Sequence, residues 1–314
     1  MRLSLKNLAM LLPPIRRLVQ NRDALAEACR HKDEYIASLE EACQSKQRIT
    51  APLEREIDAG ADEISDLRKL PGIFLNTMPK SASVYIFSWI AQCLNLKHIT
   101  VSLSLFPDDL VIREKLDVLV KENVITQEHI PATDINLRFI AARMKKLVVH
   151  VRDPRQATLS WVHHLDRFHR QMDVHPGNWS AIEAVTPALP EDYFQRTFEE
   201  KIDWQIDNHL PLLVGWTEKW LDVQKEGLYG LDILITQFES FVTDPEETIR
   251  SILRHYGISE DRFDWSLSPE KTAEVHFRKG RIDEWLSVFT TEQRERAGKQ
   301  IPEHLRARFN WHPV

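Results

Sequence analysis

Residues 76–85, NTMPKSASVY, place a cation and two serines between two apolar runs. The run before them, GIFL, is typical of a buried strand, and the run after them, IFSWIAQCL, is typical of a buried helix. Backbone N–H groups at a helix start and the positive end of the helix dipole attract anions, and a lysine adds a full charge. Lys80, Ser81 and Ser83 therefore predict a site for a phosphate-like anion at this turn.

A nucleotide triphosphatase loop has the pattern G-x-x-x-x-G-K-[ST], whose backbone cradles phosphates. Phe74 and Pro79 stand at the two glycine positions here, so the Lys80-Ser81 pair alone is a weak match to that loop. A kinase or triphosphatase that uses Asp153, at the end of LVVHVRD, as a metal ligand remains one alternative.

The stretch TMPKSASVY resembles the 5′-phosphosulfate loop of the sulfotransferases, whose usual form is Y-P-K-S-G-T-T-W. It keeps the Pro-Lys-Ser core and differs at four consecutive residues, Ala82, Ser83, Val84 and Tyr85. Alanine in place of glycine is a mild departure if residue 82 is already helical, whereas Val84 removes one donor hydroxyl. The resemblance implies that this loop binds the 5′-phosphosulfate, and that Tyr85 either contacts the adenine or packs in the core.

A second segment, VVHVRDPRQATLSW, resembles the 3′-phosphate motif of the same family. Its strand-end arginine, Arg152, is followed eight residues later by Ser160. If a helix begins at Asp153-Pro154, the serine lies about two turns into it, so that both side chains can converge on one phosphate.

A third segment, FRKGRIDEWLSVFT at residues 277–290, resembles the late family signature R-K-G-x-x-G-x-W-x-x-x-F-T. The resemblance implies that Arg278, Lys279 and Gly280 close over the 3′-phosphate. GWTEKW and ILITQFESFVTDP also resemble family segments, and Phe238 stands where the family usually has the tyrosine of Tyr-Glu-Asp. Phe238 is either a nucleotide contact or a core aromatic residue.

The resemblance covers residues 70–314 and implies an α/β fold with a P-loop-like, mostly parallel sheet flanked by helices. It implies 3′-phosphoadenosine 5′-phosphosulfate as the sulfuryl donor, an acceptor that carries a hydroxyl group, and no metal ion. Lys80 and the N–H groups from Ser81 to Ser83 are then aimed at the charge that develops on the leaving 5′-phosphate. A nucleotide-binding module that has kept the fold but lost turnover is the second alternative.

The acceptor hydroxyl needs a general base, and two adjacent residues are candidates. ITQEHIPA resembles the family segment K-T-H-x-P, whose histidine is the base, and His129 is its counterpart. Some sulfotransferases that act on polysaccharides use a glutamate, which leaves Glu128 as the other candidate. Successive side chains of a strand point to opposite faces, so only one of the two can face the cleft. We expect this to be His129, because Pro131 ends the strand nearby, and we expect Glu128 to pair with a basic residue.

From Leu70 onwards, the sequence predicts strands that alternate with helices. The predicted strands are GIFLNT, HITVSL, NVITQEHI, KLVVHVR and LDILITQF, and the predicted helices span residues 84–96, 109–121, 135–145, 156–170 and 244–256. This alternation predicts a buried, mostly parallel sheet whose ligands lie beyond the carboxyl ends of the strands.

Residues 166–203 are rich in prolines and aromatics without a clear period, and they predict a long loop or lid. With the loop at residues 106–109, this segment is expected to shape the acceptor pocket. The acceptor class stays open between a sugar, a lipid-linked glycan and a small alcohol. Four aromatic residues are candidates either for stacking on the acceptor or for the core of the lid: Trp179, Tyr193, Trp204 and Trp216.

The chain of 314 residues has 43% hydrophobic and 28% charged residues, which is ordinary for a soluble globular protein. Its net charge of −6 does not favour nucleic acid as a partner. Three cysteines without metal-like spacing predict reduced thiols and a reducing, cytoplasmic compartment. His163 and His164 are adjacent and do not share a helix face, so they do not predict a metal site together with His169.

Residues 1–69 are not covered by the resemblance and are assigned to a helical extension. A weak seven-residue spacing, interrupted by Pro52, is compatible with an association helix, and hence a homodimer, or with an arm packed on the main domain. The apolar run at residues 8–12 is too short for a signal peptide, and no run of about 18 apolar residues predicts a transmembrane helix. A basic amphipathic N-terminus leaves peripheral membrane contact open.

Overall fold

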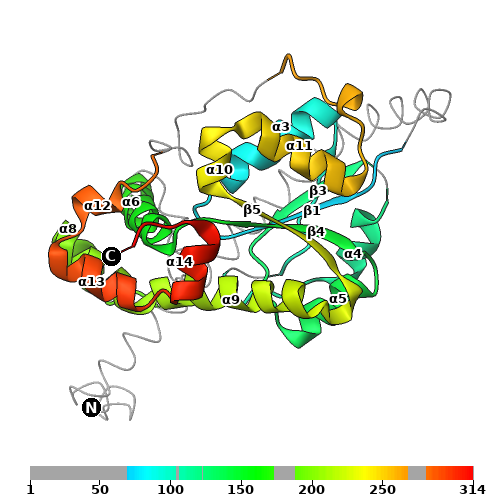
Figure 1. Cartoon of the computed structure of the whole chain (residues 1–314). Coiled ribbons are helices and arrows are strands. Elements are labelled where there is room, and N and C mark those ends of the chain that lie inside the picture. The colour runs from blue at the N-terminus through cyan, green and yellow to red at the C-terminus, as the bar shows by residue number, and fades with distance from the viewer. Residues whose placement is uncertain (1–68, 104–105, 122, 173–187, 268–280, 314) are drawn as a thin grey trace, which may run out of the picture. The chain divides into compact units, whose positions relative to one another are not determined.

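The computed structural model describes residues 69–103, 106–121, 123–172, 188–267 and 281–313. Within them the chain forms a sheet of five strands in the order β2-β3-β1-β4-β5, and every neighbouring pair is parallel. The strands are β1 Ile73–Thr77, β2 Lys97–His98, β3 Val124–Glu128, β4 Lys146–Val151 and β5 Asp232–Gln237. Helices flank this sheet, which confirms the predicted α/β class (Figure 1).

The register of the sheet brings the carboxyl ends of β1, β3 and β4 together. Asn76 lies beside Glu128 of β3 and Val149 of β4, and Thr77 lies beside His150. All five residues of β1 are buried, as expected for a parallel strand covered on both faces. The loops that follow these three strands therefore begin at one edge of the sheet, which we call the carboxyl edge.

The predicted strand HITVSL is wrong over most of its length. Only Lys97 and His98 pair with β3, and both are exposed. Further along, Val101 is buried and donates its N–H to the carboxylate of Glu128 at 2.6 Å. A buried side-chain carboxylate thus takes the place of a neighbouring strand, which hydrophobic patterning alone does not reveal.

Helices cover both faces of the sheet (Figure 1). Side chains alternate along β1, so that Ile73 and Leu75 join one core cluster and Phe74 joins the other. The first cluster includes residues of α3 (Ser83–Leu94), α10 (Phe238–Thr243) and α11 (Pro245–Tyr256). The second includes residues of α4 (Arg113–Leu119), α5 (Asp134–Ala141), α6 (Pro154–Met172), α8 (Phe198–Asn208), α9 (Leu210–Glu226), α12 (Trp285–Val288), α13 (Thr291–Lys299) and α14 (Glu303–Phe309).

The five predicted helices are present as α3, α4, α5, α6 and α11, with shifted ends. The predicted loop at residues 166–203 is wrong at both ends, because α6 continues to Met172 and α8 begins at Phe198. A capping box explains the second boundary: Thr197 accepts the N–H of Glu200, whose carboxylate accepts the N–H of Thr197 at 2.8 Å. Residues 173–187 of that segment lie outside the described residues.

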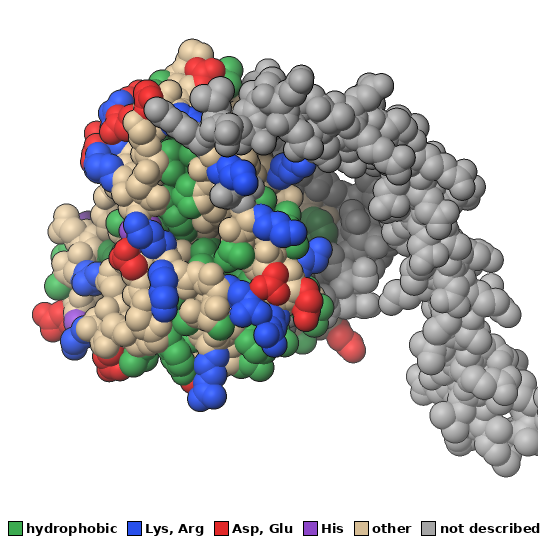
Figure 2. Space-filling view, turned by 90° about the vertical axis from the view of Figure 1, so that its right-hand side faces the viewer, with side chains coloured by type: hydrophobic (Ala, Val, Ile, Leu, Met, Phe, Trp, Pro, Cys, Tyr) green, Lys and Arg blue, Asp and Glu red, His purple; other side chains and the backbone are tan. Residues whose placement is uncertain are grey.

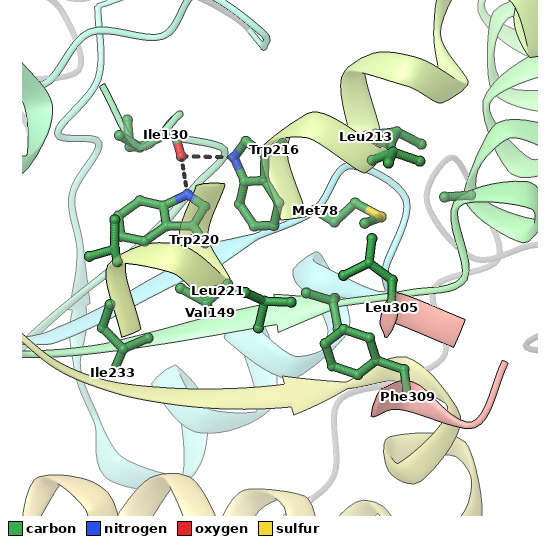
Figure 3. Packing of buried hydrophobic residues seen from close by; sticks show 14 of the residues in the cluster. Met78, Ile130, Val149, Leu213, Trp216, Trp220, Leu221, Ile233, Leu305 and Phe309 are labelled. Carbon is green, nitrogen blue, oxygen red and sulfur yellow. Dashed lines mark hydrogen bonds between the residues drawn. The ribbon is translucent and has the colours of Figure 1, made fainter. Parts of the chain in front are cut away.

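Two indoles of α9 hold the chain just past the end of β3. The Nε1–H groups of Trp216 and Trp220 donate to the carbonyl oxygen of Ile130 at 2.8 and 2.9 Å (Figure 3). Trp216 and Tyr193, two of the candidates for acceptor stacking, are buried in the core. Trp204 is partly buried, and Trp179 lies outside the described residues.

The face on the side of α4 and α5 mixes basic and acidic side chains with apolar ones (Figure 2). Arg138 pairs with Asp134 at 2.9 Å, Arg143 pairs with Asp117, and Ile135 of α5 is exposed. Within the described residues, none of the helices combines the length and the apolar character needed to cross a membrane.

Gly72, just before β1, packs directly against the backbone of α4. A Cβ atom at this position would lie 1.8 Å from the carbonyl oxygen of Leu119, whereas a Cβ at Gly215 in α9 would meet nothing within 4 Å. We expect Gly72→Ala to lower the free energy of unfolding by about 1–3 kcal/mol through overpacking. Gly215→Ala should raise it by about 0.5–1 kcal/mol, because alanine is the better helix former.

Urea unfolding of both variants measures this difference. Equal stability of the two alanine variants would contradict the close approach of Gly72 to α4.

Candidate active site

The turn between β1 and α3 has an uncommon backbone conformation. Lys80 and Ala82 have φ angles of 65° and 67°, in the left-handed region. Ala82 is the N-cap residue of α3, so the condition that it is already helical does not hold. A left-handed backbone costs an alanine about 1–2 kcal/mol, whereas glycine adopts it freely. The conformation thus gives a physical reason for the glycine that is usual in the motif this loop resembles.

The same turn gathers the features of an anion site. Left-handed residues within a turn are one conformation in which successive N–H groups form an anion-binding concavity. Helix α3 has 12 residues and begins at Ser83, so the positive end of its dipole and the first-turn N–H groups, including that of Val84, lie at this turn. Lys80 is partly exposed there and adds a positive charge.

His150 of β4 supports the turn. Its Nε2 lies 2.9 Å from the carbonyl oxygen of Ser81, and its Nδ1 lies 2.8 Å from the hydroxyl of Thr236. A carbonyl oxygen only accepts, so Nε2 carries the proton. Burial lowers the pKa of His150 to about 4, the hydrogen bond to Ser81 raises it, and the charge of Arg152 lowers it. The hydroxyl of Ser81 donates to Met78 at 2.6 Å and so holds the turn as well.

Arg152 follows β4 directly and is 6% exposed. Its guanidinium donates to the carbonyl oxygens of Lys80 at 2.5 Å and Arg281 at 3.3 Å. The guanidinium carbon lies 3.7 Å from the centre of the Phe238 ring, a cation–π contact. Phe238 is therefore a buried support for the arginine. Ser160 is partly exposed in the second turn of α6, which begins at Pro154, so the condition for the Arg152 and Ser160 spacing is met.

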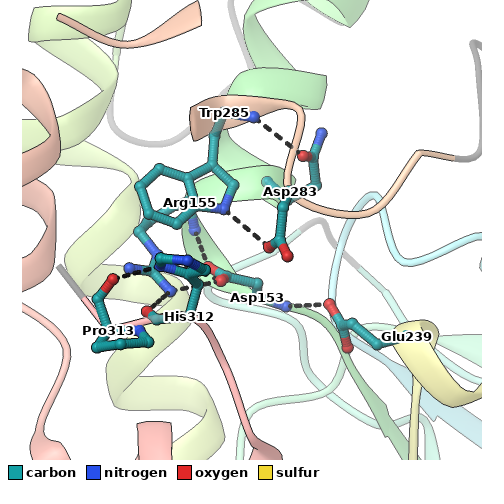
Figure 4. A network of polar contacts seen from close by, with 8 residues as sticks. Asp153, Arg155, Glu239, Asp283, Trp285, His312 and Pro313 are labelled. Atoms are coloured by element: carbon teal, nitrogen blue, oxygen red, sulfur yellow. Dashed lines mark hydrogen bonds and ion pairs between the residues drawn. The ribbon is translucent and has the colours of Figure 1, made fainter. Parts of the chain in front are cut away.

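A buried ion pair fixes the start of α6 (Figure 4). Arg155 and Asp153 are 0% and 1% exposed, and their side chains meet at 2.6 Å. The same guanidinium lies 3.8 Å from the Trp285 ring centre and donates to the carbonyl oxygen of His312 at 2.8 Å. The N–H of Asp153 donates to Glu239 at 3.0 Å. The carboxylate of Asp153 thus serves the fold, which argues against its interpretation as a metal ligand.

His129 lies directly after β3, and its Nδ1 is 2.6 Å from the carbonyl oxygen of Thr77. Because that oxygen only accepts, Nδ1 carries the proton and the lone pair is on Nε2, which lies 3.5 Å from the amide nitrogen of Gln127. Burial lowers the pKa of His129 to about 4, the Thr77 carbonyl raises it, and the charge of Lys80 lowers it. The ring is therefore neutral at neutral pH and keeps a basic nitrogen near the lysine.

The carboxylate of Glu128 is directed elsewhere. It is 4% exposed and accepts three hydrogen bonds of 2.6 Å each, from the N–H of Val101 and the hydroxyls of Thr126 and Ser102. The expectation of a basic partner is therefore wrong, because two hydroxyls and a backbone N–H satisfy the carboxylate instead.

The side-chain amide of Asn76 joins the ends of β1 and β3. It accepts the N–H of Ile130 at 2.7 Å and donates to the carbonyl oxygen of the same residue at 3.1 Å. Both bonds are buried, so the amide replaces the backbone partners that residue 130 loses where the strand ends. Asn76 and Thr77 together therefore hold residues 129 and 130.

Sequence reasoning missed Asn76, His150 and Thr236. Each is a polar residue inside an apolar strand segment, and that contrast is the signal that could have identified them. Tyr85 packs edge to face against Trp89 and Phe241, with ring centres 6.1 and 6.0 Å apart. Three predicted site residues lie outside the described residues: Arg278, Lys279 and Gly280. Across the described part of the chain, no group of three or more His, Cys, Asp or Glu is placed to hold a metal ion.

The comparisons with known proteins identify the family of the chain. The sulfotransferase domain model matches residues 87–308, which is most of the chain, and the chain therefore belongs to this family. The match begins just after the Lys80 turn. Among solved structures, mouse sulfotransferase SULT7A1 complexed with PAP is 16% identical, with a TM-score of 0.48, over 76% of this chain and 86% of that one.

A sulfotransferase from Alicyclobacillus acidocaldarius is 12% identical, with a TM-score of 0.42, over 77% of this chain and 96% of that one. No curated protein matches the chain. The assignment to the family therefore rests on the domain match.

The left-handed Ala82 gives a stability test of the turn. We expect Ala82→Gly to raise the free energy of unfolding by up to about 1 kcal/mol, because the relief of backbone strain exceeds the added freedom of the unfolded chain. Ala91→Gly is the matched control: it is the same substitution inside α3, at a residue packed against the same core cluster. It should lower the free energy of unfolding by about 1 kcal/mol. If thermal unfolding showed that both variants lose similar stability, residue 82 would not be strained.

Proposed function

We propose that the protein transfers a sulfuryl group from 3′-phosphoadenosine 5′-phosphosulfate to an acceptor hydroxyl. The observation that carries the proposal is the arrangement at the carboxyl edge. There the Lys80 turn, Arg152 and His129 follow three adjacent strands, β1, β4 and β3. Membership of the sulfotransferase domain family supports the reaction class.

Lys80 and the N–H groups at the start of α3 stabilise the charge that the leaving nucleotide gains on its 5′-phosphate. When the sulfur–oxygen bond to this phosphate breaks, the bonding electrons stay on the phosphate oxygen. A lysine and helix N–H groups fixed in advance at that position favour the transition state over the ground state. The left-handed turn keeps these groups in place before the donor arrives.

His129 acts as the general base for the acceptor hydroxyl. Its Nδ1–H is held by the Thr77 carbonyl, which leaves Nε2 to take the proton as the hydroxyl oxygen bonds to sulfur. Burial, aided by the charge of Lys80, lowers the pKa of the ring and keeps it neutral before the reaction. Glu128 has its oxygens occupied by three donors and serves as a structural residue.

Arg152 and Ser160 bind the 3′-phosphate, which does not react. The arginine is held against Phe238, and the serine lies partly exposed on α6. Their task is recognition, so they distinguish a 3′-phosphorylated nucleotide from other adenine nucleotides.

Nucleotide binding tests the donor assignment. We expect 3′,5′-bisphosphoadenosine to stabilise the native protein by about 2.7 kcal/mol at a hundredfold excess over its dissociation constant. Adenosine 5′-phosphate lacks the 3′-phosphate and should shift the melting temperature much less. Ser160→Ala should reduce the difference between the melting-temperature shifts that the two nucleotides cause. Ser251 is a partly buried serine of α11, and Ser251→Ala should leave this difference unchanged. Equal shifts with both nucleotides in the native protein would refute the assignment.

The role of His129 predicts a pH profile. A base with a pKa of about 4 stays neutral between pH 7 and 5, and its neutral fraction falls only as the pH approaches that pKa. The acid limb of kcat/KM for the free enzyme should therefore lie well below the value of about 6.5 for an ordinary histidine. His129→Ala should lose about 10²–10⁴-fold in turnover while bisphosphate binding persists.

Glu128→Gln is the control for this assignment. Glutamine has the shape of glutamate, but its amide N–H₂ group would face a group that donates, such as the Val101 N–H or the Ser102 hydroxyl. The variant should therefore be less stable, while its folded molecules keep substantial activity. An inactive Glu128→Gln protein beside an active His129→Ala protein would transfer the role of base to the glutamate.

A further inference from the structure

His209 lies between α8 and α9 and is 1% exposed. Neither of its ring nitrogens has a hydrogen-bond partner among the described residues. Buried polar groups in folded proteins are nearly always hydrogen-bonded, and an unmet one normally implies a water molecule or a ligand. Phenylalanine would fill a similar space without burying two unpaired nitrogens. The presence of an imidazole therefore indicates a polar partner.

The ring belongs to an aromatic stack beside Ser160. Trp161 lies parallel to His209, with ring centres 5.3 Å apart and planes 10° apart, and His164 stacks on Trp161 at 5.2 Å. Phe106 meets His209 edge to face at 6.0 Å. The ring faces therefore contact one another, and the ring edges are what remains for hydrogen bonding. Such an arrangement favours a polar ligand over one that must stack on a free aromatic face.

The direction of α9 places His209 at the carboxyl edge. Near the C-terminal end of the helix, Gln224 donates to Ile233 at the start of β5, and further back Trp216 donates to Ile130 just past the end of β3. The helix thus runs antiparallel to the strands (Figure 1). His209 lies seven residues before Trp216, which carries it about 10 Å further along the axis, beyond the strand ends.

Burial lowers the pKa of His209 to about 3, so the ring is neutral at neutral pH. A neutral imidazole offers one N–H donor and one nitrogen acceptor. A hydroxyl group also donates and accepts, so it is the complement of this ring. A simple alcohol has only the hydroxyl that reacts at sulfur beside His129, and its apolar group would leave both nitrogens of His209 without a partner.

We propose that His209 binds the acceptor, and that the acceptor is a polyhydroxylated, sugar-type molecule whose neighbouring hydroxyl groups bond the imidazole edge. The proposal rests on the sulfuryl-transfer function proposed above and specifies its acceptor class. Trp161 and Phe106 hold the ring in place.

Transfer from radiolabelled donor tests the proposal, with neutral methyl glycosides as one acceptor set and 4-nitrophenol and 2-naphthol as the other. The native protein should use glycosides in preference to the phenols. His209→Phe keeps the ring stack but removes both nitrogens. It should raise the KM for the glycoside at least about tenfold, equivalent to 1.4 kcal/mol, while bisphosphate binding stays unchanged. Its melting temperature should rise by a few degrees, because two unpaired polar atoms leave the interior.

His255→Phe is the control, because it is the same substitution at a partly buried histidine of α11, near Asp232 at the other end of β5. It should leave the glycoside KM unchanged. A native KM in His209→Phe, or transfer to phenols only, overturns the acceptor proposal. Bisphosphate binding without glycoside transfer also overturns it but leaves the donor assignment standing, whereas loss of both would overturn the proposed function itself.

Discussion

The site depends on the side-chain amide of Asn76. Strands β1 and β3 pair through their backbones as far as Asn76 and Glu128, and the amide then binds both the N–H and the carbonyl of Ile130. The next residue of β1, Thr77, holds the imidazole of His129 through its carbonyl oxygen. The end of a single strand therefore positions the candidate base and also begins the turn that carries Lys80. The distance between these two groups is set by covalent geometry, by the two buried hydrogen bonds of Asn76 and by the partly buried hydrogen bond of His129.

The charges at the carboxyl edge follow from the close approach of these strand ends. The chain carries a net charge of −6, yet Lys80 and Arg152 lie close together at this edge, joined by the hydrogen bond between the guanidinium and the lysine carbonyl. Burial and these cations lower the pKa values of His129 and His150, so neither ring adds positive charge at neutral pH. The positive charge at this edge therefore comes from the lysine and the arginine, and the two histidine rings are neutral.

Much of this arrangement can be predicted from the sequence because it depends on local patterns. Apolar runs identify four of the five strands, and a strand-end position identifies Lys80, His129 and Arg152 as neighbours. Contacts between distant residues could not be foreseen in the same way. The carboxylate of Glu128 replaces a strand partner for Val101, and His150 supports the Lys80 turn from a neighbouring strand. The left-handed backbone angle of Ala82 could not be predicted from the sequence either, because only the three-dimensional path of the turn requires it.

The carbonyl oxygen of Ile130 accepts from Asn76, Trp216 and Trp220 at once. Because this acceptor belongs to the main chain, no substitution at residue 130, proline included, removes it. The side chain at residue 130 can therefore be exchanged for other apolar side chains of similar shape, and the hydrogen bonds to the carbonyl oxygen remain. The three donors have no such freedom, since an asparagine amide and two indole N–H groups have few substitutes of equal reach. Selection at this junction therefore acts on the three donor residues more strongly than on residue 130, which supplies the acceptor.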